Sequence, residues 1–295
     1  MSAIAGAPTA VTTVARPTTQ RLLLGRWVYR GLRHLFLILA VFFALLPVVL
    51  MVQASFKTML DFYSNPLGFP ETWEWRNYVD VWHDARIPEY ATNSLIVTAV
   101  SVPLILLLSC LAGYGLVRFQ FAGSRWLFVY FVSGLLIPVQ LTILPTALQL
   151  RTLHIANSRA GLIAVSVALA IPFSVFLMAG FFRSLPSELA EAAYLDGAGE
   201  LRAFWDVMLP LTRPALATVA IFSGVGIWNE FFLPLVLTPD VPTLQVGVNG
   251  LRGYYSTDWG NIFAGVTIAS LPVLIAYWLL TKQFIRGLSA GAVKG

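Results

Sequence analysis

The chain has 295 residues, of which 58% are hydrophobic and 11% are charged, with a mean hydropathy of +0.76. Soluble domains carry about 25% charged residues, so this composition excludes an ordinary soluble domain and indicates several membrane crossings. The net charge of +5 is spread over separate loops without a dense basic run, which argues against nucleic-acid binding. Cys110 is the single cysteine, so an internal disulfide and a cysteine-rich metal site are also excluded.

The chain begins with an arm, residues 1–30, that we expect to be basic, disordered and cytoplasmic. Met1–Gln20 is rich in alanine, threonine and proline, which is typical of disorder. Positive charges beside a first apolar segment hold that end of a membrane protein in the cytoplasm. Five arginines take this position: Arg16, Arg21, Arg26, Arg30 and Arg33.

Six apolar segments follow, which predict an all-α membrane protein with six transmembrane helices over residues 31–283. The first is an unbroken apolar run whose helix would be about 27 Å long, close to the thickness of a bilayer. An even number of spans places both ends, including the tail 284–295, in the cytoplasm, where most of the 19 lysine and arginine residues then lie. The segments are Leu35–Val52, Asn93–Leu116, Trp126–Leu148, Ala160–Phe182, Pro214–Leu237 and Asn261–Thr281.

Two of the segments that connect the predicted spans are expected to lie outside the cell. Phe56–Tyr90 carries acids, tryptophans and prolines, and we expect it to form an external loop of short helices. Gly247–Tyr255 is the last outer loop, and it is either an interfacial loop with aromatic anchors or a contact for an external partner.

The longest polar interruption of the second half, Pro186–Pro210, is predicted to be a cytoplasmic helix–turn–helix within residues 184–213. Ser184 or Ser187 is expected to cap the first helix, and Asp196-Gly197 is expected to form the turn. Pro210 is expected to end the second helix because proline lacks the N–H donor. The second helix carries an amphipathic stripe of Leu201, Phe204, Trp205, Met208 and Leu209.

The interruption carries a motif. Glu191-Ala192-Ala193, Gly197 and Val207-Met208-Leu209-Pro210 stand at the spacing of the EAA loop of ABC importer permeases, which they resemble, with valine at 207 where isoleucine is usual. Trp228-Asn229-Glu230 and the end Gly291–Gly295 resemble the carbohydrate-importer branch, the maltose-permease type. The resemblance covers the chain from about Arg33 onward.

The resemblance implies a permease subunit of a bacterial sugar importer in the plasma membrane. Its loop would be a coupling helix that inserts into a groove of an ATP-binding subunit, and Glu191 would meet a basic residue there. The tail is expected to contact the same subunits. The implied partners are a second paralogous permease, a dimer of ATP-binding subunits that holds ATP and Mg²⁺, an external solute-binding protein and a sugar. The implied coupling residues are Glu191, Ala192, Ala193, Tyr194, Leu195, Asp196, Gly197, Leu209 and Pro210.

No catalytic residue, cofactor or metal ligand is expected in this chain itself. It has no glycine-rich phosphate loop of the GxxxxGK[ST] kind, so ATP hydrolysis would belong to a separate subunit. His34, His83 and His154 are far apart in the sequence and show no metal-binding spacing.

Two groups of polar residues fall inside the predicted spans. Trp228, Asn229 and Glu230 lie in the fifth span, where an ionisable side chain costs roughly 2.5–3.5 kcal/mol and therefore should face a cavity or another helix. Gln140 and Thr142 lie between two prolines of the third span. Both groups either line the sugar pathway or hold helices together by hydrogen bonds, and both interpretations stand.

Three alternative functions are kept. A permease of another ABC importer class, for peptides or amino acids, would share the EAA loop but is disfavoured by Trp228-Asn229-Glu230 and by the end Gly291–Gly295. An intramembrane enzyme using Glu230 would need a second catalytic group at the same depth, and the predicted spans hold no other acid. A membrane sensor remains possible only if no ATPase binds the loop.

Overall fold

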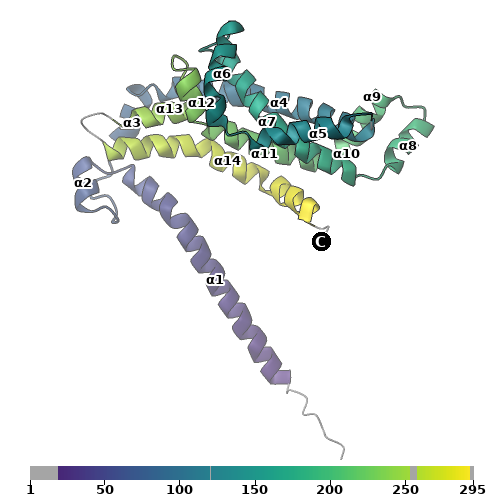
Figure 1. Ribbon diagram of the computed structural model, residues 1–295. Coiled ribbons are helices and arrows are strands. Elements are labelled where there is room, and N and C mark those ends of the chain that lie inside the picture. The colour runs from purple at the N-terminus through teal and green to yellow at the C-terminus, as the bar shows by residue number, and fades with distance from the viewer. Residues whose placement is uncertain (1–18, 120, 253–257, 293–295) are drawn as a thin grey trace, which may run out of the picture. The chain divides into compact units, whose positions relative to one another are not determined.

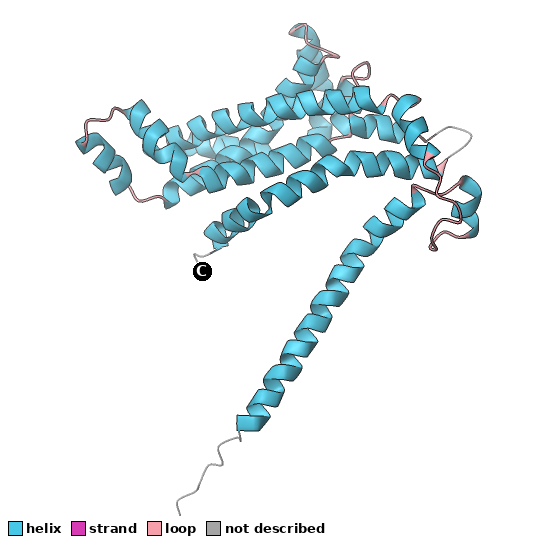
Figure 2. Ribbon diagram, turned by 180° about the vertical axis from the view of Figure 1, so that it is seen from behind, coloured by secondary structure: helices cyan, strands magenta, loops and turns pink. Residues whose placement is uncertain are grey.

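The computed structural model describes residues 19–119, 121–252 and 258–292, and within these ranges every regular element is a helix (Figures 1 and 2). The chain divides into two compact units, Met1–Met51 and Val52–Gly295. The predicted all-α membrane fold is confirmed.

Most of the first unit is one helix, α1 (Thr19–Ala54). Its part from Tyr29 to Ala54 is long and apolar enough to cross a membrane. The helix therefore begins inside the predicted arm 1–30, while residues 1–18 lie outside the described part of the structure.

The second unit contains three further unbroken helices of membrane-spanning length: α4 (Ile87–Arg118), α7 (Arg159–Ser184) and α14 (Trp259–Ala292). Two bent pairs complete the set of apolar helices. Ser124–Leu136, which includes α5 (Ser124–Ser133), meets α6 (Val139–Thr152) at 105°, and Glu200–Leu211 meets α11 (Arg213–Asn229) at 72°. The described residues thus hold four helices long and apolar enough to cross a membrane, or up to six such segments if each bent pair is counted as one.

Two predicted spans are not straight helices. The predicted span Trp126–Leu148 breaks at Ile137, whose backbone is extended, because the following Pro138 disfavours a helical residue before it. The predicted span Pro214–Leu237 is also interrupted, since α11 ends at Asn229 and the short helix α12 (Phe232–Leu237) follows after an extended Glu230.

The helices of the second unit pack around α4. α7 lies along α4, α11 contacts both helices, and α14 packs on α11 (Figure 1). A Cβ atom at Gly113 of α4 would come within 2.9 Å of the Met178 side chain of α7, so the small residue lets the two backbones approach closely. α4 and α7 start at the same end of the unit, where the Nε of Arg159 donates a hydrogen bond of 2.9 Å to Asn93.

We call this the distal end; it contains the starts of α4 and α14 with α2 (Met59–Ser64), α3 (Arg76–His83) and α13 (Leu244–Gly250). The predicted short helices of Phe56–Tyr90 are confirmed by α2 and α3. α13 covers the first part of the predicted loop Gly247–Tyr255, and residues 253–257 lie outside the described residues.

A fully buried lysine organises part of the distal end. Lys57 donates a hydrogen bond to the Asn65 carbonyl, and its own carbonyl accepts one of 3.0 Å from the Asn77 amide. A Cβ atom at Gly260 would lie 2.4 Å from the same carbonyl, so only glycine lets α14 start against this segment. The tail 284–295 is helical as far as Ala292, and residues 293–295 are not described.

Candidate coupling loop and membrane cavity

The polar interruption folds as two short helical arms around a turn. The first arm is α8 (Glu188–Leu195). The second arm consists of α9 (Glu200–Arg202), a π-helical segment Ala203–Met208 and α10 (Leu209–Leu211). The predicted helix–turn–helix is therefore present, but the middle of its second arm is π-helical instead of α-helical.

The turn lies where the sequence predicts it. Gly197 has a φ of +80°, in the left-handed region that side chains with a Cβ atom rarely adopt. The N–H of Gly197 donates to the Tyr194 carbonyl and the N–H of Ala198 donates to the Ala193 carbonyl, which closes the end of α8. A Cβ atom at Gly197 would contact nothing within 4 Å, so backbone conformation alone requires the glycine.

Two predictions about the ends of these arms are wrong. Ser187 stands at the start of α8, but its side chain makes no capping hydrogen bond, and the Ser184 hydroxyl instead donates to Phe181 in the last turn of α7. Pro210 does not end the second arm, because it lies in the first turn of α10, where its missing N–H is not needed. The chain changes direction one residue after α10, at Thr212.

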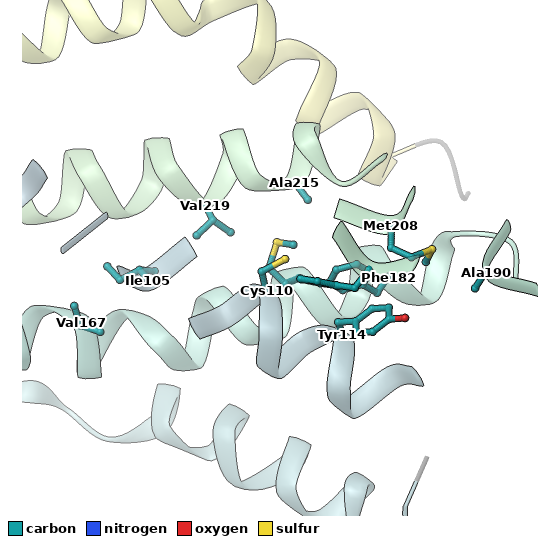
Figure 3. Packing of buried hydrophobic residues seen from close by; sticks show 11 residues of the cluster. Ile105, Cys110, Tyr114, Val167, Phe182, Ala190, Met208, Ala215 and Val219 are labelled. Carbon is teal, nitrogen blue, oxygen red and sulfur yellow. The ribbon is translucent and has the colours of Figure 1, made fainter. Parts of the chain in front are cut away.

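One face of the loop is buried against the ends of α4 and α7. Ala190 and Ala193 of the first arm and Phe204 and Met208 of the second are buried. The Phe204 ring lies 4.8 Å from the ring of Tyr114 on α4, centroid to centroid. Figure 3 shows this cluster, in which Tyr114 lies beside Phe182 of α7 and close to Met208. The loop is thus packed onto the helix bundle and does not hang free.

Polar contacts reinforce this packing. The Tyr194 hydroxyl donates a hydrogen bond of 2.6 Å to the carboxylate of Glu200, which joins the two arms. The guanidinium of Arg118, the last residue of α4, donates to the same hydroxyl at 3.2 Å, lies 4.9 Å over the Tyr194 ring and is 3.7 Å from the Glu200 carboxylate. The Tyr114 hydroxyl is 3.5 Å from Glu200. We call these four residues the loop joint.

The opposite face of the loop is exposed and combines acidic with apolar groups. Glu191, Ala192 and Asp196 are exposed, and Leu195 is 90% exposed, which is unusual for a leucine. The nine predicted coupling residues therefore divide between two faces. Ala193 is buried, Tyr194 is part of the loop joint, and Leu209 and Pro210 are half-buried.

The second group of predicted site residues surrounds the break between α11 and α12. One carboxylate oxygen of Glu230 accepts hydrogen bonds from the N–H groups of Phe232 and Leu233, at 2.9 and 3.1 Å. The indole N–H of Trp228, a residue that is 8% exposed, donates to the Ala269 carbonyl of α14 at 3.0 Å. Asn229 is exposed and accepts a hydrogen bond of 3.3 Å from Gln245.

A cavity of about 430 Å³ lies beside Glu230, between α7 and α11. Its wall combines the Glu230 side chain with the aromatic rings of Phe173 and Phe222, whose centroids are 5.7 Å apart. Ser166 and Ser223 add two hydroxyl-bearing side chains to the lining. This combination of aromatic faces with hydroxyl and carboxylate groups is suited to a polyol.

The other predicted pathway residues lie elsewhere. Gln140 is exposed on α6, and the Thr142 hydroxyl donates to the Val139 carbonyl at 2.7 Å, within the same helix. Neither residue lines the cavity beside Glu230. The structure therefore brings Glu230 to a cavity but does not bring Gln140 and Thr142 to it.

The sequence reasoning missed Tyr114, Arg118, Glu200, Ser166 and Ser223. The available signal for Arg118 was the position of a positive charge at the end of the predicted span Asn93–Leu116. Serines in apolar spans carry little signal, since a serine also bonds its own helix, as Ser174 does to the Ala170 carbonyl.

Comparison with known proteins assigns the chain to a family. The family model described as "Binding-protein-dependent transport system inner membrane component" matches residues 19–289. The chain belongs to this family. Its members are components of membrane transport systems, so the chain is a multi-pass membrane transport subunit and not an enzyme.

Named relatives are permease proteins. The chain is 38% identical over 271 residues to the "Diacetylchitobiose uptake system permease protein NgcG" of Streptomyces coelicolor, covering 90% of this chain and 89% of that protein. It is 33% identical over 253 residues to the "Melibiose/raffinose/stachyose import permease protein MelC" of Bacillus subtilis, covering 85% and 91%.

A solved structure shares the fold. A chain of a bacterial ABC transporter involved in the import of the acidic polysaccharide alginate superposes with a TM-score of 0.72 at 21% identity, over 92% of this chain and 100% of that chain. Among the described residues, no group of three or more histidine, cysteine or acidic side chains could hold a metal ion.

Proposed function

We propose that this chain is the membrane-spanning permease subunit of an ATP-driven sugar importer that receives its substrate from an external solute-binding protein. The family description supports the dependence on a binding protein, and the relatives named for the uptake of short oligosaccharides support a sugar as substrate. The observation that carries the proposal is the segment from α8 to α10, which we call the coupling loop. One of its faces is packed on the helix ends, and the other presents acidic and apolar groups to a partner.

The exposed face is the proposed docking surface for an ATP-binding subunit. The Leu195 side chain is the apolar anchor, and Glu191 and Asp196 supply negative charge for a basic groove. Ala192, exposed between them, keeps α8 narrow enough to enter a groove. The ATP-binding subunits, as a dimer, hold ATP and Mg²⁺, and their closure and opening move the loop.

The same proposal orients the chain. The coupling loop and both termini lie in the cytoplasm and the distal end lies outside, as the distribution of lysine and arginine supports. A second, paralogous permease subunit completes the membrane part, and the distal end, including the segment 247–255, receives the binding protein. The helices have two arrangements, which open the pathway to opposite sides of the membrane. ATP and the loaded binding protein change the relative stability of these two arrangements, and this change produces alternating access.

The cavity beside Glu230 is the proposed part of the sugar pathway in this subunit. Phe173 and Phe222 supply ring faces for a sugar, and the free carboxylate oxygen of Glu230 is available to its hydroxyl groups. Trp228 and Asn229 hold the neighbouring helices by their hydrogen bonds to Ala269 and Gln245. Gln140 and Thr142 remain candidates for a part of the pathway on α6.

The test is purification of the complex through a tag on the N-terminal arm, followed by identification of the bound proteins and reconstitution in vesicles. We expect a second permease and an ATPase to co-purify, and ATP-dependent uptake of a labelled oligosaccharide in the presence of its binding protein. Uptake of peptides or amino acids instead would move the chain to another importer class. A lone chain, or one bound only to an unrelated effector, would contradict the proposal and favour a sensor.

A further inference from the structure

The short helix α3 carries a stripe of large apolar side chains that the described chain leaves uncovered. Val79 and Trp82 of the helix and Trp75, the residue before its first turn, are all exposed. These three residues recur at i, i+4 and i+7, so they lie along one side of the helix. We call them the α3 stripe.

The other sides of α3 are of different character. Arg76, Asp80 and His83 follow the same spacing one position later in the chain, and Arg76 forms an ion pair of 3.5 Å with Asp80. Asn77 and Val81 are buried. α3 is therefore amphipathic, but its apolar side is wider than the part that is used for packing within the chain.

The side chains of the α3 stripe are of the type that collects at a membrane surface. Tryptophan is enriched at membrane–water interfaces because its ring is apolar and its indole N–H is polar. The indole N–H groups of Trp228 and Trp259 each donate to a protein acceptor at 3.0 Å. Those of Trp75 and Trp82 donate to no described residue, as expected for rings whose polar edge meets water or lipid headgroups.

Contacts with α14 fix the depth of α2 and α3. The apolar, membrane-spanning part of α14 begins at Trp259, and the Phe62 ring of α2 stacks on the Trp259 ring at a centroid distance of 5.5 Å. A Cβ atom at Gly265 would lie 3.6 Å from the Val81 side chain of α3, and Gly265 is six residues, or about 9 Å, further along α14. Both short helices thus lie beside the first turns of a spanning segment.

This depth favours lipid as the partner of the stripe. The headgroup layer on each side of a bilayer is roughly 5–8 Å thick, so a helix at this level meets headgroups and the first part of the acyl chains. A soluble protein would approach from the end of the bundle, whereas the α3 stripe lies alongside it. On α2, at the same level, Leu60 and Tyr63 are also exposed.

We propose that α2 and α3 form an interfacial anchor, whose partner is the phospholipid surface at the distal end. The α3 stripe lies among the glycerol groups and the first methylene groups of the lipids, and the side with Arg76, Asp80 and His83 is turned to water. The anchor holds the segment between the first span and α4 at a fixed height in the membrane. The inference goes beyond the proposed function, since it requires only that the chain spans a membrane.

Spin labelling of the full chain in phosphatidylcholine vesicles tests the proposal. Cys110, the single cysteine of the chain, is buried, so a cysteine introduced on α3 is the one that reacts with a nitroxide label in the folded protein. Val79→Cys places the label on the α3 stripe, and His83→Cys places it one turn away on the charged side. Collisions with oxygen, which concentrates in lipid, and with a nickel chelate, which stays in water, report the surroundings of each label.

The two labels should differ in opposite directions. We expect the ratio of oxygen collisions to nickel-chelate collisions to be several-fold higher at position 79 than at position 83, in the isolated chain and in the assembled complex. Equal ratios would place the stripe in water and overturn the proposal. A label at position 79 that neither reagent reaches would also overturn it, because another protein subunit would then cover the stripe.

A second measurement uses the native tryptophans and needs no label. In vesicles of phosphatidylcholine brominated in the upper part of the acyl chains, bromine quenches the fluorescence of nearby indole rings. We expect Trp82→Phe to lower the quenched fraction of the fluorescence. Trp228→Phe is the matched control and should not lower this fraction, because Trp228 is buried within the protein. An unchanged fraction in Trp82→Phe would contradict the anchor, whether or not the labelled variants fold.

Discussion

The coupling loop and the break at Glu230 both interrupt a helical backbone, but different groups form the hydrogen bonds at the two interruptions. The turn of the loop is exposed, and there Gly197 adopts a left-handed conformation. The break between α11 and α12 lies within the predicted fifth span, beside the cavity, and there the Glu230 carboxylate accepts hydrogen bonds from two N–H groups of α12. The comparison shows that a glycine lets the turn close through hydrogen bonds within the backbone, whereas the break between α11 and α12 uses an acidic side chain as the acceptor for the first N–H groups of α12.

The largest effect is expected from removal of that partner. Glu230→Ala leaves the N–H groups of Phe232 and Leu233 without their acceptor. The Phe232 contact is exposed and the Leu233 contact is partly buried, so each lost hydrogen bond costs about 0.5–1.5 kcal/mol. We expect a lower melting temperature of the purified subunit and poor assembly. Glu230→Gln keeps an oxygen acceptor and is the matched control for folding. A normal melting temperature in Glu230→Ala would show that the capping contact is dispensable.

The Gln variant also sharpens the question of the pathway. With folding preserved, Glu230→Gln removes only the negative charge beside the cavity. A change in the KM for uptake would support contact with the sugar, whereas an unchanged KM together with normal assembly would assign Glu230 to the structural role alone.

The next largest effect is expected at the turn of the loop. Gly197→Asp adds a negative charge next to the proposed docking face, at a left-handed backbone position that aspartate tolerates better than most residues. We expect the purified complex to lose its ATPase and its uptake while the chain still inserts into the membrane. Gly197→Asn, whose side chain tolerates this backbone conformation and is neutral, should retain more ATPase. Normal uptake by Gly197→Asp would contradict docking at this loop.

A smaller effect is expected from Trp228→Phe. This substitution keeps an aromatic ring in the packing but leaves the Ala269 carbonyl without its donor, which should lower the free energy of unfolding by about 1 kcal/mol. Thermal melting in lipid nanodiscs measures this change. An altered KM for the sugar without a change in melting would instead place the indole in the pathway.

The smallest effect is expected at the exposed face of the loop. Glu191→Ala removes one exposed charge that makes no hydrogen bond among the described residues, so the fold of the subunit should not change. We expect a several-fold weaker retention of the ATPase during purification and a corresponding decrease of uptake. Glu188→Ala, on the same helix at another exposed position, is the comparison. Equal effects of both substitutions would argue for general electrostatics instead of a specific contact at Glu191.

The sequence by itself determined the features that depend on local chemistry. Long apolar segments predict membrane helices because lipid cannot satisfy an open backbone, and the positions of α1, α4, α7 and α14 follow from this rule. The turn at Gly197 follows from the backbone freedom of glycine. The spacing of Glu191, Gly197 and Pro210 was sufficient to indicate the family that the comparison establishes.

The tertiary structure decided the features that depend on which groups meet. Ser187 was a plausible cap, yet its side chain makes no capping bond, and Pro210 was a plausible helix end, yet it starts a turn of helix. Local sequence does not specify these outcomes because each residue type fits several backbone positions. The loop joint is likewise invisible in the sequence, since Arg118 and Glu200 come from separate helices and meet only because α4 and the coupling loop share a buried face.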